Sequence, residues 1–94
     1  MRFGWNPDKA ASNLSKHGIA FEDAARVFLD PLAMHEQDRI VDGEERWQTI
    51  GTVDNHRLLV VAHTSSDDEG GEEYIRIISA RKAERRERQR YEGA

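Results

Sequence analysis

The sequence predicts a small α+β protein that forms one domain over residues 1–94. In the first third of the chain, apolar residues recur with helical spacing. From about residue 34 onward, they show the alternation and β-branched content of strands. The strand-like segments are separated by short turns, and helical patterns lie only towards the two ends of the chain. This order is typical of an antiparallel sheet with segregated helices.

The N-terminal segment predicts a strand followed by a helix. Arg2 to Trp5 is short and partly apolar, as an opening strand would be. Asn6-Pro7 is typical of an N-cap followed by proline at the first helical position, and Gly18 suits a left-handed C-terminal cap. These signals predict a helix over residues 7–17. Its inward side is expected to carry Ala10, Leu14 and His17.

A second helix is expected directly after the first. Acidic residues occupy its first turn, and Asp30-Pro31 ends it, because the residue before proline is pushed out of the α region. Its apolar residues fall at helical spacing: Phe21, Ala24, Ala25 and Phe28.

The remaining chain predicts three to four further strands and a last helix. Asp42-Gly43 and Asp54-Asn55 are turn signals. The run from Leu58 to Ala62 is apolar on both faces, which favours a central place in the sheet. The expected strands are residues 34–38, 47–53, 57–64 and 74–79, with an acidic turn at 67–73 and a helix from Ala80 to about Tyr91 capped by Ser79.

Composition excludes several classes of protein. The net charge is −4, no cysteine is present, and the longest apolar run is far too short to span a bilayer. No secretory signal pattern follows Met1, so a cytoplasmic location without membrane association is expected. Charge is segregated: residues 76–94 hold seven basic against three acidic side chains. This suggests a polyanion or acidic partner, or only a solvated helix with pairs such as Glu84 with Arg88.

Familiar catalytic motifs are missing from the sequence. It has no glycine-rich phosphate loop, no serine nucleophile elbow and no helical histidine pair with metal spacing. The four histidines fall on separate predicted elements, so neither a metal site nor a cofactor is expected.

Cations near the predicted last strand suggest a phosphate site. Alternation places Arg76 on one face of the sheet, opposite its apolar neighbours. Arg81 is expected in the first turn of the last helix, where backbone N–H groups favour an anion. Arg46, beside Glu45, begins another strand. If the strands pair as predicted, these groups share one face, although each arginine alone suits an exposed strand position equally well.

RNA offers chemistry that such a site can perform without a metal. The 2′-hydroxyl attacks the adjacent phosphate when a base, an acid and cations are in place. Glu45 or His17 would be base or acid, although His17 also suits a helix-end residue packed on the core. The candidate cations are Arg46, Arg76, Arg81 and Lys9. Further candidate RNA contacts are Lys16 (in a polar stripe with Lys9 and Asn13), Arg85, Arg88 and Tyr91, which stacks a base or docks its helix.

The motifs of this chain resemble the BrnT toxins along nearly its whole length. In the N-terminal half the resemblance rests on Trp5-Asn6-Pro7, Lys9, Asn13-Leu14, Lys16-His17-Gly18-Ile19, Phe21-Glu22-Asp23-Ala24 and Val27-Phe28. In the rest it rests on Glu44-Glu45-Arg46-Trp47, Ile50-Gly51, Leu58-Leu59-Val60-Val61, Glu87-Arg88, Tyr91 and, most specifically, the block from Arg76 to Ala83.

This resemblance implies a RelE-like fold and a bacterial type II toxin that cleaves RNA and inhibits translation. It also implies a ribbon-helix-helix antitoxin, BrnA, that neutralises the toxin and binds operator DNA as a complex with it. The site residues that it implies are Arg76 and Arg81, then Glu45 and Arg46, then Lys9, His17 and Tyr91. The acidic stretch Asp67 to Glu73 looks longer than the family's usual turn; it either folds over the site or forms a solvated tip. The alternative function is a non-catalytic binding module or an inactive toxin that only binds its antitoxin.

Overall fold

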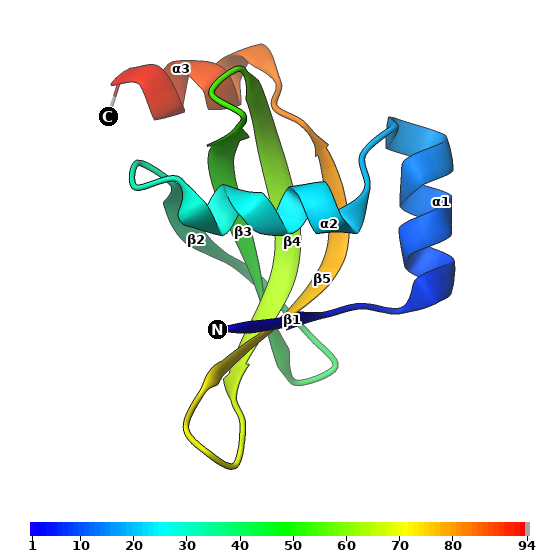
Figure 1. Ribbon diagram of the computed structural model, residues 1–94. Helices are drawn as coiled ribbons and strands as arrows, with labels where there is room; N and C mark the ends of the chain where they lie inside the picture. The colour runs from blue at the N-terminus through cyan, green and yellow to red at the C-terminus, as the bar shows by residue number, and fades with distance from the viewer. Residues whose placement is uncertain (94) are drawn as a thin grey trace.

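A five-stranded sheet with helices on both faces makes up the computed structural model, which describes residues 1–93 (Figure 1). The strands are β1 (Arg2–Gly4), β2 (Met34–Val41), β3 (Glu44–Val53), β4 (Arg57–Asp67) and β5 (Glu73–Lys82). The helices are α1 (Pro7–His17), α2 (Phe21–Ala24), the 3-10 helix η1 (Ala25–Leu29) and α3 (Arg85–Gly93). The α+β class is therefore confirmed. Within the described residues no helix is both long and apolar enough to cross a membrane.

The strands lie in the order β1-β5-β4-β3-β2, with β4 in the centre as its apolar run predicts. β1 pairs with β5 in parallel, and the other neighbours are antiparallel. Asp42 and Gly43 both have positive φ, 52° and 79°, which is the geometry of a tight hairpin turn with the twist of its strands. That turn joins β2 to β3, and β2 continues to Val41, beyond the expected end at residue 38.

The two faces of the sheet differ in what covers them. Figure 1 shows α2 and η1 running across one face, with α1 beside β5. The main core lies under them and includes Phe21, Val27, Leu59, Val61 and Ile77. The opposite face, here called the open face, carries a smaller apolar cluster against α3. Its members are Ile50, Leu58 and Val60, with Met34, Ala83 and Tyr91 at its margin.

The expected start of the last helix is wrong. β5 runs through Lys82, with Ser79 opposite Ala62 and Arg81 opposite Val60. Ser79 therefore caps no helix. Ala80 is fully buried in the main core, and pairing with the apolar β4 outweighs local helix propensity. The helix begins at Arg85, where the N–H of Glu84 donates to Glu87 Oε1 at 2.8 Å, as in a capping box.

The inward side of α1 also differs from the expected one. Leu14 is 52% exposed, whereas Asn13 is buried. The Asn13 amide donates to the carbonyls of Ile19 and Ala80 and accepts from the N–H of Ala80, each at 3.0 Å. The two bonds to Ala80 satisfy backbone groups at the edge of β5 that a neighbouring strand would otherwise pair. The polar stripe of α1 therefore excludes Asn13.

Candidate functional site

Three charged side chains meet on the open face, where β3 and β5 flank β4. Arg76 Nη2 donates to Glu44 Oε1 at 2.6 Å, and Arg46 Nε lies 3.4 Å from the same oxygen. Thr64 on β4 is opposite Arg76. Arg46 Nε is buried and has no hydrogen-bond partner among the described residues. Arg46 Nε is thus ion-paired with Glu44 without forming a hydrogen bond to it. The two guanidinium groups of this cluster, Glu44–Arg46–Arg76, are suited to binding an added anion.

Arg81 lies on the same face but not where the sequence predicted it. It is near the end of β5, outside the first turn of α3, so the argument from helix N–H groups does not apply to it. Its Nη1 and Nη2 donate to the two oxygens of Glu87, both at 2.8 Å. The hydrogen bond from Arg81 lowers the pKa of Glu87 and outweighs partial burial. Arg81 lies five positions after Arg76, roughly 16 Å along a strand, so the two arginines cannot hold one phosphate together.

A polar groove runs between α1 and β5 beside the open face. Lys9, Lys16 and His17 of α1 line it together with Ser79 of β5, around a volume of about 360 Å³. Both lysines are exposed, and His17 is half-buried at the end of the helix. Ser79 lies between Arg76 and Arg81 in the sequence of β5, so the groove continues the cationic surface of the strand.

Glu45 does not join the cluster. It is exposed and pairs with Ile40, and strand alternation points it away from the face that carries Arg46. The expectation that Glu45 shares a face with the arginines is therefore wrong, and Glu44 takes that place. The turn at Asp42-Gly43 sets this register, and residues two apart on a strand share a face. Glu44 and Arg46 have that spacing, which is the signal that sequence reasoning missed.

Tyr91 docks α3 on the sheet. Its hydroxyl donates to Asp30 Oδ2 at 2.6 Å, and the same oxygen accepts from Thr52 N–H at 2.8 Å. Burial raises the pKa of Asp30, but hydrogen bonds from Thr52, Tyr91 and Leu32 outweigh it and hold that pKa below its ordinary value. The hydrogen bond to Asp30 raises the pKa of Tyr91. The docking alternative is thus the one that the geometry supports.

The other arginines of α3 lie at the surface. Arg85 and Arg88 are exposed, and Arg88 pairs with Glu92 at 3.7 Å, where a pair with Glu84 was expected. Arg90 pairs with Glu36 of β2, which ties the helix to the sheet. Arg85 and Arg88 can extend a basic surface for RNA without belonging to the Glu44–Arg46–Arg76 cluster.

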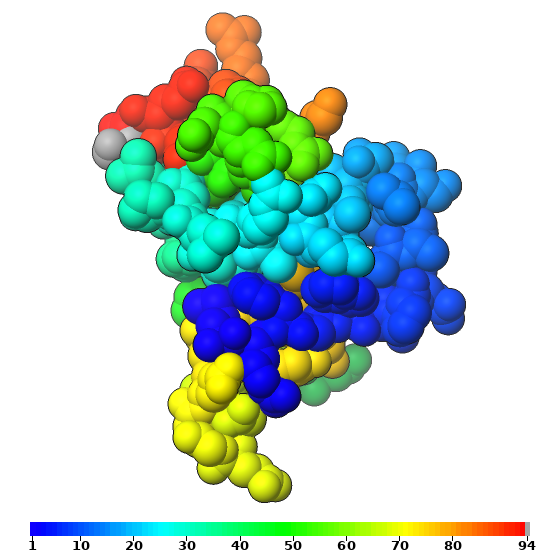
Figure 2. Space-filling view, viewed as in Figure 1, coloured from blue at the N-terminus to red at the C-terminus, as the bar shows by residue number. Residues whose placement is uncertain are grey.

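The acidic stretch forms the tip of the β4–β5 hairpin, drawn in yellow at the bottom of Figure 2. Asp68 pairs with Arg2 at 3.2 Å, and Glu72 pairs with the N-terminal amine at 3.3 Å. Asp68 also accepts from the N–H groups of Gly70 and Glu72 within the turn. Its charges thus face the N-terminal segment, which agrees with a solvated tip.

Comparisons with known proteins agree on one family. A family model described as "Ribonuclease toxin, BrnT, of type II toxin-antitoxin system" matches residues 5–87. Among solved structures, the crystal structure of the Brucella abortus ribonuclease toxin BrnT is similar to this chain, with a TM-score of 0.68 and 27% identity over 90% of this chain and 99% of that one. No curated protein matches the chain.

Proposed function

The chain belongs to the BrnT family of ribonuclease toxins of type II toxin–antitoxin systems, and we propose that it cleaves RNA on the open face of its sheet. One observation carries the choice of site: two guanidinium groups, from Arg46 and Arg76, converge on one carboxylate oxygen of Glu44. A phosphate oxygen presents the same charge and acceptor geometry to such a pair.

The proposed reaction uses the RNA's own nucleophile. When a phosphate takes the place of Glu44 on Arg76, the carboxylate is free to accept the proton of the 2′-hydroxyl. The 2′-oxygen then forms a bond to phosphorus, and the bond from phosphorus to the 5′-oxygen breaks. His17 protonates the leaving oxygen, and the arginines stabilise the charge that develops on the phosphate. In this reaction the cations are protein side chains, and no cofactor takes part.

An RNA strand bound at this site contacts the protein through more than one phosphate. Arg81 lies roughly 16 Å from Arg76 along β5, so it contacts a different phosphate. Lys9 and Lys16 line the groove beside Ser79 and guide the strand past α1. Arg85 and Arg88 extend this basic surface, while Tyr91 acts by holding α3 in place.

The biological setting follows the family. A type II toxin is neutralised by a protein antitoxin, here proposed to be a BrnA-like protein with a ribbon-helix-helix domain. Operator DNA is bound only through the complex, because the chain has no recognised DNA-reading motif of its own. The toxin acts in the cytoplasm, where RNA cleavage inhibits translation, and its fold is of the RelE type.

The test is cleavage of RNA by the purified protein with and without EDTA. Cleavage is expected to survive the chelator and to leave 2′,3′-cyclic phosphate ends, because the 2′-oxygen is the nucleophile. Loss of cleavage with EDTA, restored by a divalent ion, would contradict the metal-independent route. Folded protein that cuts no RNA yet binds its antitoxin would instead support the inactive-toxin alternative.

Two arginine variants test the position of the site. Arg76→Ala is expected to lower the rate about 10²-fold or more, because a preorganised phosphate cation is lost. Arg39→Ala removes the same charge from β2, at a side chain that is 75% exposed, and is expected to leave the rate nearly unchanged. Equal rates for the two folded variants would place the chemistry elsewhere.

A further inference from the structure

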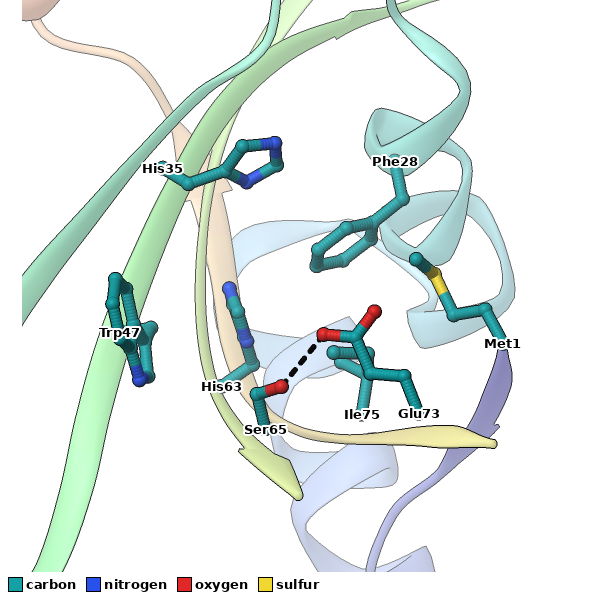
Figure 3. Close-up of a pocket in the computed structure, with 8 residues that line it drawn as sticks. All are labelled: Met1, Phe28, His35, Trp47, His63, Ser65, Glu73 and Ile75. Atoms are coloured by element: carbon teal, nitrogen blue, oxygen red, sulfur yellow. Dashed lines mark hydrogen bonds between the residues drawn. The ribbon is translucent and has the colours of Figure 1, made fainter. Parts of the chain in front are cut away.

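A second cavity lies on the face of the sheet opposite the arginines. It has a volume of about 310 Å³, at the small end of the range of ligand pockets. Phe28, His35, Trp47 and His63 surround it with aromatic rings, and Ser65 and Glu73 line it from β4 and β5. Figure 3 shows Trp47 on one side of this pocket and Phe28 on the other. The proposed RNA chemistry uses none of these six side chains.

Hydrogen bonds indicate which ring nitrogens of His63 and His35 are donors and which are acceptors. His63 Nδ1 lies 3.2 Å from the carbonyl oxygen of Thr64, which only accepts, so Nδ1 carries the proton. Burial lowers the pKa of His63, which keeps the ring neutral and leaves Nε2 as an acceptor. Thr49 Oγ1 donates to that Nε2 at 2.7 Å and therefore accepts from His35 Nδ1 at 2.8 Å. A neutral His35 therefore has its lone pair on Nε2.

Ser65 and Glu73 also offer acceptors to the pocket. Ser65 donates its hydroxyl proton to Glu73 Oε2 at 2.6 Å, so the lone pairs of Ser65 and the second oxygen of Glu73 stay available (Figure 3). These acceptors favour a ligand that brings N–H donors. The carboxylate of Glu73 also favours a positive charge on the ligand.

The aromatic rings that line the pocket favour one kind of cationic ligand group over another. A planar guanidinium stacks on aromatic faces and donates in its own plane, whereas an ammonium group is a compact, strongly hydrated charge. Phe28 and His35 are already stacked on each other, with ring centroids 5.9 Å apart and an interplanar angle of 17°. The face of Trp47 across the pocket is the surface that a guanidinium group would cover.

The charge around the pocket disfavours a nucleic acid. Glu73 ends the acidic stretch of the β4–β5 hairpin, in which Asp67, Asp68, Glu69 and Glu72 are also acidic. Arg2 and the N-terminal amine offset Asp68 and Glu72, so the hairpin keeps a net negative charge. This charge repels phosphate and attracts a basic polypeptide. We propose that the pocket binds the guanidinium group of an arginine side chain of a partner protein. That partner is the antitoxin, a choice that rests on the proposed function.

The direct test uses N-acetyl-L-arginine amide as the probe, with the Trp47 indole N–H signal followed by NMR. A saturable shift is expected, with a dissociation constant on the order of millimolar, as suits a single side chain. The citrulline analogue has nearly the same shape but no charge, and it is expected to produce no saturable shift. Equal shifts from both probes would overturn the proposal.

Matched acidic variants separate the pocket from its charged surroundings. Glu73→Gln keeps an acceptor for Ser65 and is expected to weaken binding of the arginine probe and of the antitoxin about tenfold. Glu69→Gln removes the same charge from the hairpin outside the pocket and is expected to change both affinities little. Equal losses from the two variants would mean a diffuse acidic surface. If Glu73→Gln weakens binding of the arginine probe but leaves the affinity for the antitoxin unchanged, the partner of the pocket is not the antitoxin.

A ribonuclease assay keeps this proposal apart from the proposed function. Glu73→Gln is expected to cleave RNA at the parental rate, because the pocket faces away from the arginines. Thermal unfolding of each variant verifies that it is folded. Failure of probe binding in an active ribonuclease would overturn the pocket alone, whereas probe binding in an inactive protein would overturn only the catalytic site.

Discussion

Arg81 and Glu87 join the last strand to the C-terminal helix by a bidentate ion pair, with both N–O distances at 2.8 Å. Glu87 also accepts from the N–H of Glu84 and so caps the helix that it anchors. The pair thus links the basic surface of the sheet to the position of α3. The stability of α3 and the freedom of Arg81 to meet a phosphate are therefore coupled.

We expect docking of α3 to weaken in acid. The pKa of Glu87 is lowered from its ordinary value of 4.5, chiefly by the hydrogen bond from Arg81. The stabilisation that ionised Glu87 gives to the docked helix is thus fully present above pH 4.5. It is lost as the pH falls through the lower pKa of Glu87 in the folded state. Glu87→Gln should cost about 1 kcal/mol at neutral pH, since Arg81 is one-third exposed and the pair is partly screened.

Amide hydrogen exchange of residues 85–93 and thermal unfolding measure this effect. Glu92→Gln is the matched control, because its pair with Arg88 is exposed and 3.7 Å long. The Glu87→Gln protein should also lose much of the acid-dependent change seen in the parent. If both variants exchange alike at neutral pH, the pair does not anchor the helix.

A second expectation concerns Asn13, whose amide makes three hydrogen bonds, each of 3.0 Å, to backbone groups of Ile19 and Ala80. Asn13→Ala leaves those groups buried and unpaired, so the free energy of unfolding should fall by about 2–4 kcal/mol. Ser12→Ala, one residue earlier and exposed, should change it little. Urea unfolding of both variants measures the difference, and similar midpoints would contradict a structural role for Asn13.

Much of the fold can be predicted from local signals. Asn6 caps α1 by accepting from the N–H groups of Asp8 and Lys9, and Gly18 ends it with φ of 70°, as the sequence indicates. The apolar run of β4 also predicts its central place. The burial of Asn13 and the extension of β5 to Lys82 do not follow from such local signals. Both depend on which backbone groups remain unpaired at the edge of the assembled sheet, and no local pattern records that.

Part of the site can be predicted in the same way, and part of it cannot. Alternation places Arg76 opposite its apolar neighbours, and both of these isoleucines are 1% exposed. Glu44 and Glu45 have the same side chain, so residue type alone does not predict which of them contacts Arg46. The register of the hairpin decides it. Likewise, the sequence places Arg81 beside a helix terminus, whereas pairing of β5 with β4 carries it onto the open face.

The two neighbouring glutamates offer a sharp test of that register. Glu44→Gln removes the proposed base and is expected to lower the rate of RNA cleavage about 10²-fold. Glu45→Gln changes the same charge on the opposite face and is expected to leave the rate nearly unchanged. Rates measured on one RNA substrate under single-turnover conditions compare the two. A larger loss in the Glu45 variant would show that the active conformation differs from this register.

The last expectation joins the ribonuclease to its partner. Expressed alone in a bacterium, the parent protein should stop growth, and co-expression of its antitoxin should restore it. Neutralisation in cells must be nearly complete, so we expect a nanomolar dissociation constant, about −12 kcal/mol. Apolar contacts should supply much of this energy, while charges set the association rate, so high salt should slow association more than it speeds dissociation.

The double variant Arg76→Ala/Arg81→Ala should then be harmless to cells, because both phosphate contacts of β5 are lost. It should still bind the antitoxin, since the proposed arginine pocket lies on the opposite face of the sheet. Growth curves and titration of the purified pair measure the two properties separately. A folded double variant as toxic as the parent would refute the arginine site. A harmless variant that no longer binds the antitoxin would place the inhibitor on the open face, directly over the arginines, where it would block RNA by occupying the site.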